Sequence, residues 1–166
     1  MIKNWKKLAV VAALVAAAPL ASATTLSLGS WQTFFFGAPG LIDTYTIDVD
    51  PGSHVKVKIT DGFVIGDEFS YQVDGGPLHF TSDASADDGL DAGAVTGDQA
   101  WADPRYSHDI FTLYAGSHTI DLFLTVNAAG TSGGAGFIRA DVPEPGALAL
   151  LGLGLAGLAV SRRRKQ

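Results

Sequence analysis

The middle of the chain alternates between apolar and polar residues over short runs, with almost no helical period. In Val55-Lys56-Val57-Lys58-Ile59, an extended chain places the two lysines on one face and the aliphatic residues on the other. The runs at 45–49 and 69–73 repeat this pattern. Such alternation is typical of strands that bury one face.

Turn residues separate the alternating runs. Asp74-Gly75-Gly76-Pro77 and Ala115-Gly116-Ser117 each predict a reversal of the chain. Further strands are expected at 26–28, 33–36, 78–80, 110–114, 118–126 and 137–139. About eight short strands joined by such turns predict an all-β fold, an antiparallel β-sandwich or jelly roll. Residues 81–106 form a long irregular stretch, in which 100–103 are expected to make a single helical turn.

Residues 1–23 have the three parts of a secretory signal peptide in the expected order. Lysines supply a positive start, residues 8–18 are all apolar, and Ala21-Ser22-Ala23 supplies the small residues that signal peptidase needs. The apolar run is shorter than the ~20 residues that span a bilayer. We therefore expect a signal helix that signal peptidase removes before Thr24.

The C-terminal tail, residues 143–166, has three parts when the preceding Val142 is taken with it. The first segment is Val142, Pro143, Glu144, Pro145 and Gly146. An apolar run follows and ends at Val160. The basic end is Arg162, Arg163, Arg164 and Lys165. As a helix the apolar run is only ~22 Å long, short for a ~30 Å hydrocarbon core, and the basic end stays cytoplasmic. We expect a short transmembrane helix that anchors the protein temporarily.

Residues 24–142 remain as one exported domain. This segment contains four of the 11 Lys and Arg residues and 16 of the 17 Asp and Glu residues, so its net charge is near −12. Such a surface repels nucleic acid, and no nucleic-acid partner is expected. The domain contains no cysteine, which excludes disulfides and thiol chemistry.

Of these 16 acids, 15 are aspartates, and six of those lie in the long irregular stretch. Asp61 and Asp67 flank a turn bounded by glycines, and Asp87 and Asp88 lie in the long stretch, which can fold over that turn. Carboxylate oxygens on loops suit calcium, so these four residues are candidate calcium ligands. A solvated acidic loop is the alternative.

No catalytic residues are predicted. Ser107-His108-Asp109 places suitable residue types side by side, but a catalytic triad is assembled from distant segments. The histidines have no metal-binding spacing, so a zinc site is not expected. Trp101 and Tyr106 are candidates for stacking against a ligand such as a sugar ring, with packing in the core as the alternative.

The tail resembles the PEP-CTERM sorting signal. Pro143, Glu144 and Pro145 match the motif, and the glycine-rich apolar run and terminal arginines match the rest. The stretches F-V-I-G-D-E-F-S-Y, W-A-D-P-R-Y-S and L-Y-A-G-S-H-T-I resemble a common type of PEP-CTERM cargo domain. The resemblance implies a β-sandwich in a protein that an exosortase, a membrane-embedded cysteine transpeptidase, processes in a Gram-negative bacterium that makes exopolysaccharide.

These observations predict an exported protein that is anchored transiently in the cytoplasmic membrane. It would then join the cell surface or the exopolysaccharide matrix of a biofilm, without catalytic activity of its own. Exopolysaccharide is the expected partner besides the processing enzymes. The alternative function is a calcium-dependent module that binds carbohydrate or protein.

Overall fold

The computed structural model describes residues 23–83, 88–94 and 96–143. The predicted signal helix and transmembrane helix lie outside these residues. The described part contains seven strands and one helix, in the order β1 (Thr24–Thr25), β2 (Gln32–Phe36), β3 (Gly40–Gly62), β4 (Glu68–Val73), β5 (Leu78–Phe80), α2 (Gly97–Ala102), β6 (His108–Val126) and β7 (Gly134–Asp141).

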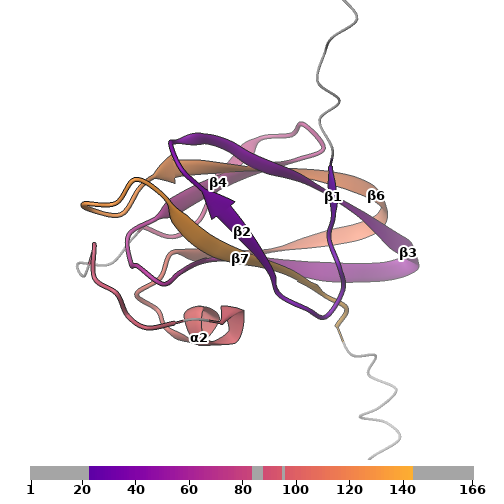
Figure 1. Cartoon of the computed structure of the whole chain (residues 1–166). Helices are drawn as coiled ribbons and strands as arrows, with labels where there is room; N and C mark the ends of the chain where they lie inside the picture. Colours follow the sequence, from indigo (N-terminus) through magenta and orange to yellow (C-terminus); the bar gives the residue numbers. More distant parts are fainter. Residues whose placement is uncertain (1–22, 84–87, 95, 144–166) are drawn as a thin grey trace, which may run out of the picture.

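The strands form one mostly antiparallel sheet in the order β2-β7-β3-β6-β4-β5. Figure 1 labels all of these strands except β5. The exception is β1, which pairs parallel with β3. The prediction of an antiparallel all-β domain is therefore confirmed. Seven strands are found in the described residues, where about eight were predicted.

Strands β3 and β6 are much longer than the alternation predicted. The runs at 45–49 and 55–59 belong to the single strand β3, and the turn predicted at 115–117 is part of β6. The two strands pair antiparallel from Gly40↔Leu124 to Thr60↔His108. The pairing continues on both sides of residues 50–53, from Val49↔Gly116 to His54↔Tyr114. Residues 50–53 are therefore an irregularity within β3, with a register shift, and do not reverse the chain.

The sheet curls so that strands far apart in its order face one another. Phe34 of β2 packs edge-on against Phe69 of β4, with ring centroids 5.2 Å apart, although three strands separate β2 from β4 in the sheet. The alternating apolar residues point into the space between, where Tyr45, Ile47, Val57 and Ile59 are buried, among others. In β3 the predicted inward face is therefore the buried one, whereas all three residues of β5 are exposed.

The helix α2 covers one end of the curled sheet, below β7 in Figure 1. Thr96 begins the helix with a capping box that involves Gln99. Ala100 packs in a second apolar cluster with Ile65, Tyr106 and Phe137. This cluster lies next to the turn between β3 and β4, which carries the candidate site.

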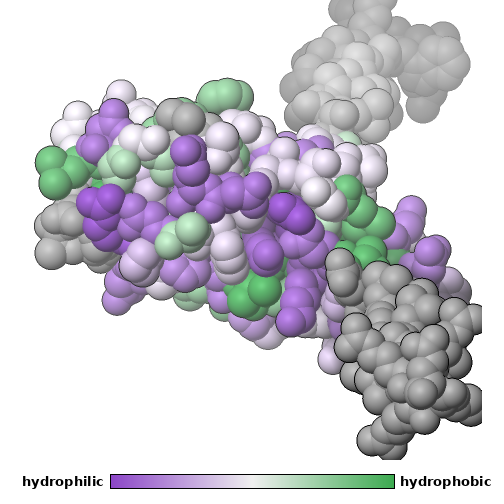
Figure 2. Space-filling view, turned by 90° about the horizontal axis from the view of Figure 1, so that it is seen from below, coloured by the Kyte–Doolittle hydropathy of each residue, from purple (hydrophilic) through white to green (hydrophobic). Residues whose placement is uncertain are grey.

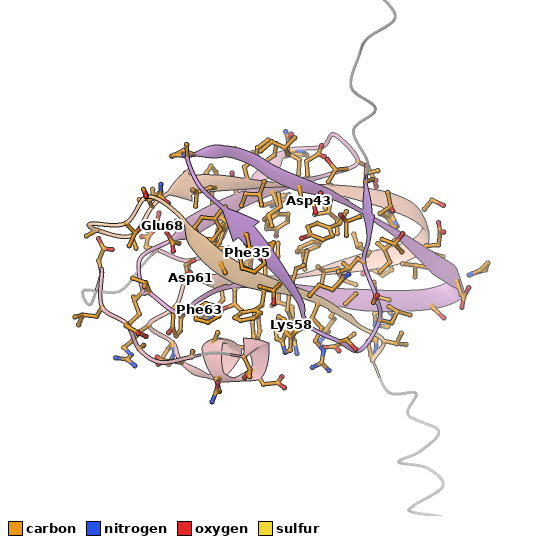
Figure 3. All side chains as sticks on the ribbon, viewed as in Figure 1. Phe35, Asp43, Lys58, Asp61, Phe63 and Glu68 are labelled. Carbon is orange, nitrogen blue, oxygen red and sulfur yellow. The ribbon has the colours of Figure 1, made fainter. Side chains whose placement is uncertain are left out.

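The exposed surface is mainly polar. Figure 2 shows hydrophobic residues in small, separate areas of a largely hydrophilic face. Among the residues that the structure describes, Phe35 of β2 is the most exposed large apolar one, at 76%. It lies on the front of the molecule in Figure 3.

Candidate functional site

Asp61 organises the turn between β3 and β4. The carboxylate of Asp61 accepts hydrogen bonds from the backbone N–H of Gly62 at 2.6 Å and of Asp67 at 3.3 Å. The Asp61 side chain is fully buried. In Figure 3, Asp61 lies at the same end of the molecule as Phe63 and Glu68. The glycine-bounded turn therefore brings Asp61 and Asp67 together, as the sequence predicted.

Asp67 joins this turn to two distant segments. Its Oδ1 atom accepts a hydrogen bond from the backbone N–H of Ala128 at 2.8 Å, in the loop between β6 and β7. Its main-chain carbonyl accepts the hydroxyl of Ser107 at 2.5 Å, just before β6. Asp67 is 1% exposed. Ser107 and Ala128 are 40 and 61 residues away in sequence, and no local pattern marked them as partners.

Part of the long irregular stretch does fold over the turn. The backbone N–H of Ile65 donates to Leu90 at 2.9 Å, and that of Gly89 donates to Ile65 at 2.7 Å. Asp88 lies against Gly66 and accepts the N–H of Ala129 at 2.9 Å. Asp87 lies outside the described residues.

The buried carboxyls hold their protons unusually tightly. Burial, followed by the negative charge of Asp67, raises the pKa of Asp61 to about 8. Burial also raises the pKa of Asp67, and the charge of Asp88 adds to that shift. In the described part of the chain, the ion pairs include neither Asp61 nor Asp67.

The described residues supply only part of the ligand set that a calcium ion needs. Calcium takes six to eight oxygen ligands. Within the described ranges, no group of three or more histidine, aspartate or glutamate side chains is arranged to hold a metal ion. Asp61 and Asp67 supply two adjacent carboxylates with Asp88 close by, and further ligands would have to be carbonyl oxygens or water.

The two candidate stacking residues have different environments. Tyr106 is 1% exposed, and its hydroxyl donates to the carbonyl of Phe63 at 3.0 Å, so its ring presents no open face. Trp101 is partly exposed and packs 6.2 Å from Trp31, while Lys58 Nζ lies 5.2 Å from its ring centroid. Trp101 therefore helps to hold α2 on the sheet.

Ser107, His108 and Asp109 each bond to a different partner. Ser107 donates to the Asp67 carbonyl, and His108 Nδ1 lies 2.9 Å from the Tyr106 carbonyl. Asp109 accepts the Tyr71 hydroxyl at 2.7 Å. The three side chains therefore do not form a hydrogen-bonded relay.

A groove between β4, β5 and the start of β6 was not predicted from the sequence. It has a volume of about 450 Å³, and its lining includes Tyr71, His79, Asp109 and Phe111. The ring of Tyr71 stacks on that of Phe111 at 4.4 Å. The alternation placed Tyr71 and Phe111 on strands, but their meeting depends on how the sheet curls.

The sorting segment begins where the folded domain ends. Strand β7 ends at Asp141, and Val142 and Pro143 follow directly. The rest of the motif (Glu144, Pro145 and Gly146), the apolar run and the basic end (Arg162, Arg163, Arg164 and Lys165) lie outside the described residues. Among the residues that the structure describes, no helix has the length and apolar character needed to cross a membrane.

Comparisons with known proteins give information on the tail and little on the domain. No curated protein matches the chain. A Cry1Da tryptic core variant from Bacillus thuringiensis is 11% identical, with a TM-score of 0.41 over 72% of this chain; the match covers 22% of that chain. The pre-peptidase C-terminal domain of a Bacillus anthracis collagenase is 13% identical, with a TM-score of 0.34 over 74% of this chain and 97% of that one.

The C-terminal segment does match a family model. Residues 141–165 match the PEP-CTERM protein-sorting motif, which confirms the resemblance found in the sequence. This motif indicates a protein that is targeted to exosortase, with export and a transient membrane anchor. The chain therefore belongs to the proteins that carry a PEP-CTERM sorting domain.

Proposed function

We propose that the protein is processed by exosortase and then becomes part of the cell surface or exopolysaccharide matrix of a Gram-negative bacterium. Its domain, residues 24–142, would be a β-sandwich without catalytic activity of its own. The observation that carries this proposal is the sorting motif at 141–165, directly after the last strand. The separate hydrogen bonds of Ser107, His108 and Asp109 support a binding or structural role.

The sorting step can be tested in a host that has the exosortase. Replacing Pro143, Glu144 and Pro145 together by alanine should leave the protein uncleaved in the cytoplasmic membrane, because the charged motif between two prolines is then lost. The measurement is immunoblotting of membrane and surface fractions for the protein's size. The control is Asp50→Ala, which removes one negative charge from an exposed position of the domain, as the triple variant removes one from the tail. This control should be processed normally. Unchanged processing of the triple variant would refute the sorting role.

A calcium-dependent module that binds carbohydrate or protein is the second candidate function. The buried Asp61 and Asp67 carboxylates, with Asp88 against Gly66, favour it. Two carboxylates in a buried site are stabilised by a cation, and in the described part no Lys or Arg forms an ion pair with them. The cation would also tie together the segments on which these aspartates lie.

Calcium should raise the melting temperature of the full chain in detergent at pH 8. A concentration 100 times the dissociation constant adds ~2.7 kcal/mol, which corresponds to a rise of about 10 °C for a domain of this size. The melt compares EDTA with millimolar calcium at fixed ionic strength. Magnesium should do less, because it prefers smaller octahedral sites.

Two variants make this measurement specific. Asp61→Asn should abolish the rise, whereas Asp43→Asn, which changes a carboxylate at a distance from the turn, should retain it. A rise below about 1 °C, or an equal rise with magnesium, would leave the acidic loop without a calcium function.

A further inference from the structure

Strand β6 has an unpaired edge over its first half. From His108 to Tyr114 its neighbour in the described sheet is β3 alone, because β4 pairs with β6 only from Ile120 to Val126. Five consecutive residues, 109–113, line the groove of about 450 Å³ beside this edge. Side chains of a strand alternate between its two faces, so a groove lined by consecutive residues runs along the backbone edge. The groove therefore has the position of a missing strand.

Hydrogen bonds show which backbone groups of β6 point towards this edge. Both main-chain groups of His108 bond to Ser82, on the side away from β3. The N–H of Ile110 donates to the carboxylate of the preceding aspartate at 2.8 Å, and the carbonyl of Tyr114 accepts from a histidine ring at 2.8 Å. Main-chain groups of an antiparallel strand alternate in direction every second residue. The N–H and C=O of Thr112, midway between, therefore face the groove as well.

This edge lacks the features that normally prevent a strand edge from pairing. Residues 110–114, Ile-Phe-Thr-Leu-Tyr, contain no charge and no proline, in a domain whose net charge is near −12. Edges that stay unpaired are usually protected by lysine, by proline or by being very short. Ile110 and Tyr114 are also 44% and 71% exposed, although both are large and mainly apolar. The edge is therefore suited to pairing with another uncharged strand.

The edge is complementary to a second copy of itself. In an antiparallel pair centred on Thr112, this residue faces its own copy, and Ile110 faces Tyr114 of the second copy. Such a pair of an aromatic and a β-branched residue stabilises a sheet. Phe111 and Leu113 lie on the opposite face of the strand, and those of the second copy would enter the groove. The same five residues thus supply both the strand and its binding surface.

The two ends of the edge also offer complementary polar groups. At one end, Asp109 is a hydrogen-bond acceptor, which receives the Tyr71 hydroxyl at 2.7 Å. At the other end, the ring of His118 lies between an Asp74 carboxylate oxygen at 2.7 Å and the Tyr114 carbonyl at 2.8 Å. Two such acceptors require a proton on each ring nitrogen, so His118 is a donor. An antiparallel pair brings the acceptor end of each copy beside the donor end of the other.

We propose that two copies of the chain pair through residues 110–114 in a twofold antiparallel arrangement, which continues the sheet of one copy into the other. A standard protein interface has ~20–30 residues on each side, so a contact centred on five residues is weak between freely diffusing copies. Copies held in one membrane have a higher effective concentration and pair more readily. The proposal depends neither on calcium nor on the fate of the protein after sorting.

Cysteine cross-linking of the full chain in detergent tests the pairing, because the chain has no cysteine of its own. Residues directly opposite in an antiparallel pair have Cα atoms ~5.5 Å apart, which is within the range of a disulfide. Thr112→Cys should therefore form a disulfide-linked dimer at least about tenfold faster than Thr33→Cys, an exposed position on the edge strand β2. Gel electrophoresis without reductant measures the two rates. Equal rates would overturn the proposal.

Two further cysteine variants test the register of the pair. An equal mixture of Ile110→Cys and Tyr114→Cys should form the mixed dimer about tenfold faster than either variant forms a dimer with itself. In each of those dimers the two thiols would be four residues, or roughly 13 Å, apart along the strands, which is too far for a disulfide. Faster formation of the unmixed dimers would indicate a parallel pair and contradict the twofold arrangement.

A lysine at the centre of the edge should prevent pairing without harming the fold. Thr112→Lys places two like charges opposite each other in the pair, whereas the side chain at this position is exposed in a single copy. Sedimentation of the full chain in detergent should show association weakened by at least about tenfold, with an unchanged melting temperature. Thr33→Lys is the matched control and should associate like the wild type. Wild-type association of Thr112→Lys would show that this edge is not the interface.

Discussion

Replacing Phe69 by alanine should lower the free energy of unfolding by about 3–5 kcal/mol. The Phe69 ring is 1% exposed and meets the rings of Phe34 and Phe36, with centroids 5.2 Å and 5.3 Å away. Phe69 lies on β4 and its partners lie on β2, so the cavity would form where the curled sheet closes on itself. Because small domains have only ~5–15 kcal/mol of stability, the loss is a large share of the total.

Phe35→Ala is the matched control for this experiment. Phe35 lies between the two partner rings in sequence, but its side chain points outwards and is 76% exposed. Its replacement should change stability by no more than about 0.5 kcal/mol. Denaturant titrations of both variants, followed by tryptophan fluorescence, measure the difference. Equal effects of the two changes would show that β2 and β4 do not pack face to face.

The strands were predictable because burial of one face repeats every second residue. In β3 the aliphatic residues Val55, Val57 and Ile59 are buried, and Lys56 between them is exposed, as the alternation required. The long continuous strands were not predictable. Residues such as Pro51 and Gly52 usually reverse the chain, but here the neighbouring strand β6 continues to pair on both sides of them.

The candidate site was partly predictable for a similar reason. Asp61 and Asp67 are close because they lie six residues apart at the two ends of a short turn bounded by glycines. This proximity can be predicted from the local sequence. Their partners Ser107 and Ala128 come from distant segments that only the folded sheet brings together. The burial of Tyr106 could not be predicted either, because the long stretch around it has no alternation of apolar and polar residues to indicate an inward face.

Gly66→Ala should lower the free energy of unfolding by about 2–6 kcal/mol, through two separate costs. Gly66 has a φ of +128°, a conformation that costs other residues about 1–3 kcal/mol. A Cβ atom at this position would also lie 1.9 Å from Asp88 Oδ1 and 3.0 Å from the Cα of Ala128. The side chain of Asp88 can rotate away, but the backbone of Ala128 must move, which adds about 1–3 kcal/mol.

Gly75→Ala separates these two costs. Gly75 also has a positive φ, +66°, but a Cβ atom there would meet nothing within 4 Å, so only the backbone cost of about 1–2 kcal/mol applies. The backbone cost at Gly66 can exceed that at Gly75 by about 1 kcal/mol, because their φ values differ. An excess above that amount for Gly66→Ala, measured in parallel denaturant titrations, is the energy of close packing between the turn, Asp88 and the β6–β7 loop. Equal losses in the two variants would mean that these segments are not in contact. The same close approach keeps Asp67 out of water, so Gly66→Ala should also let water reach the Asp67 carboxylate and lower its pKa towards the ordinary value.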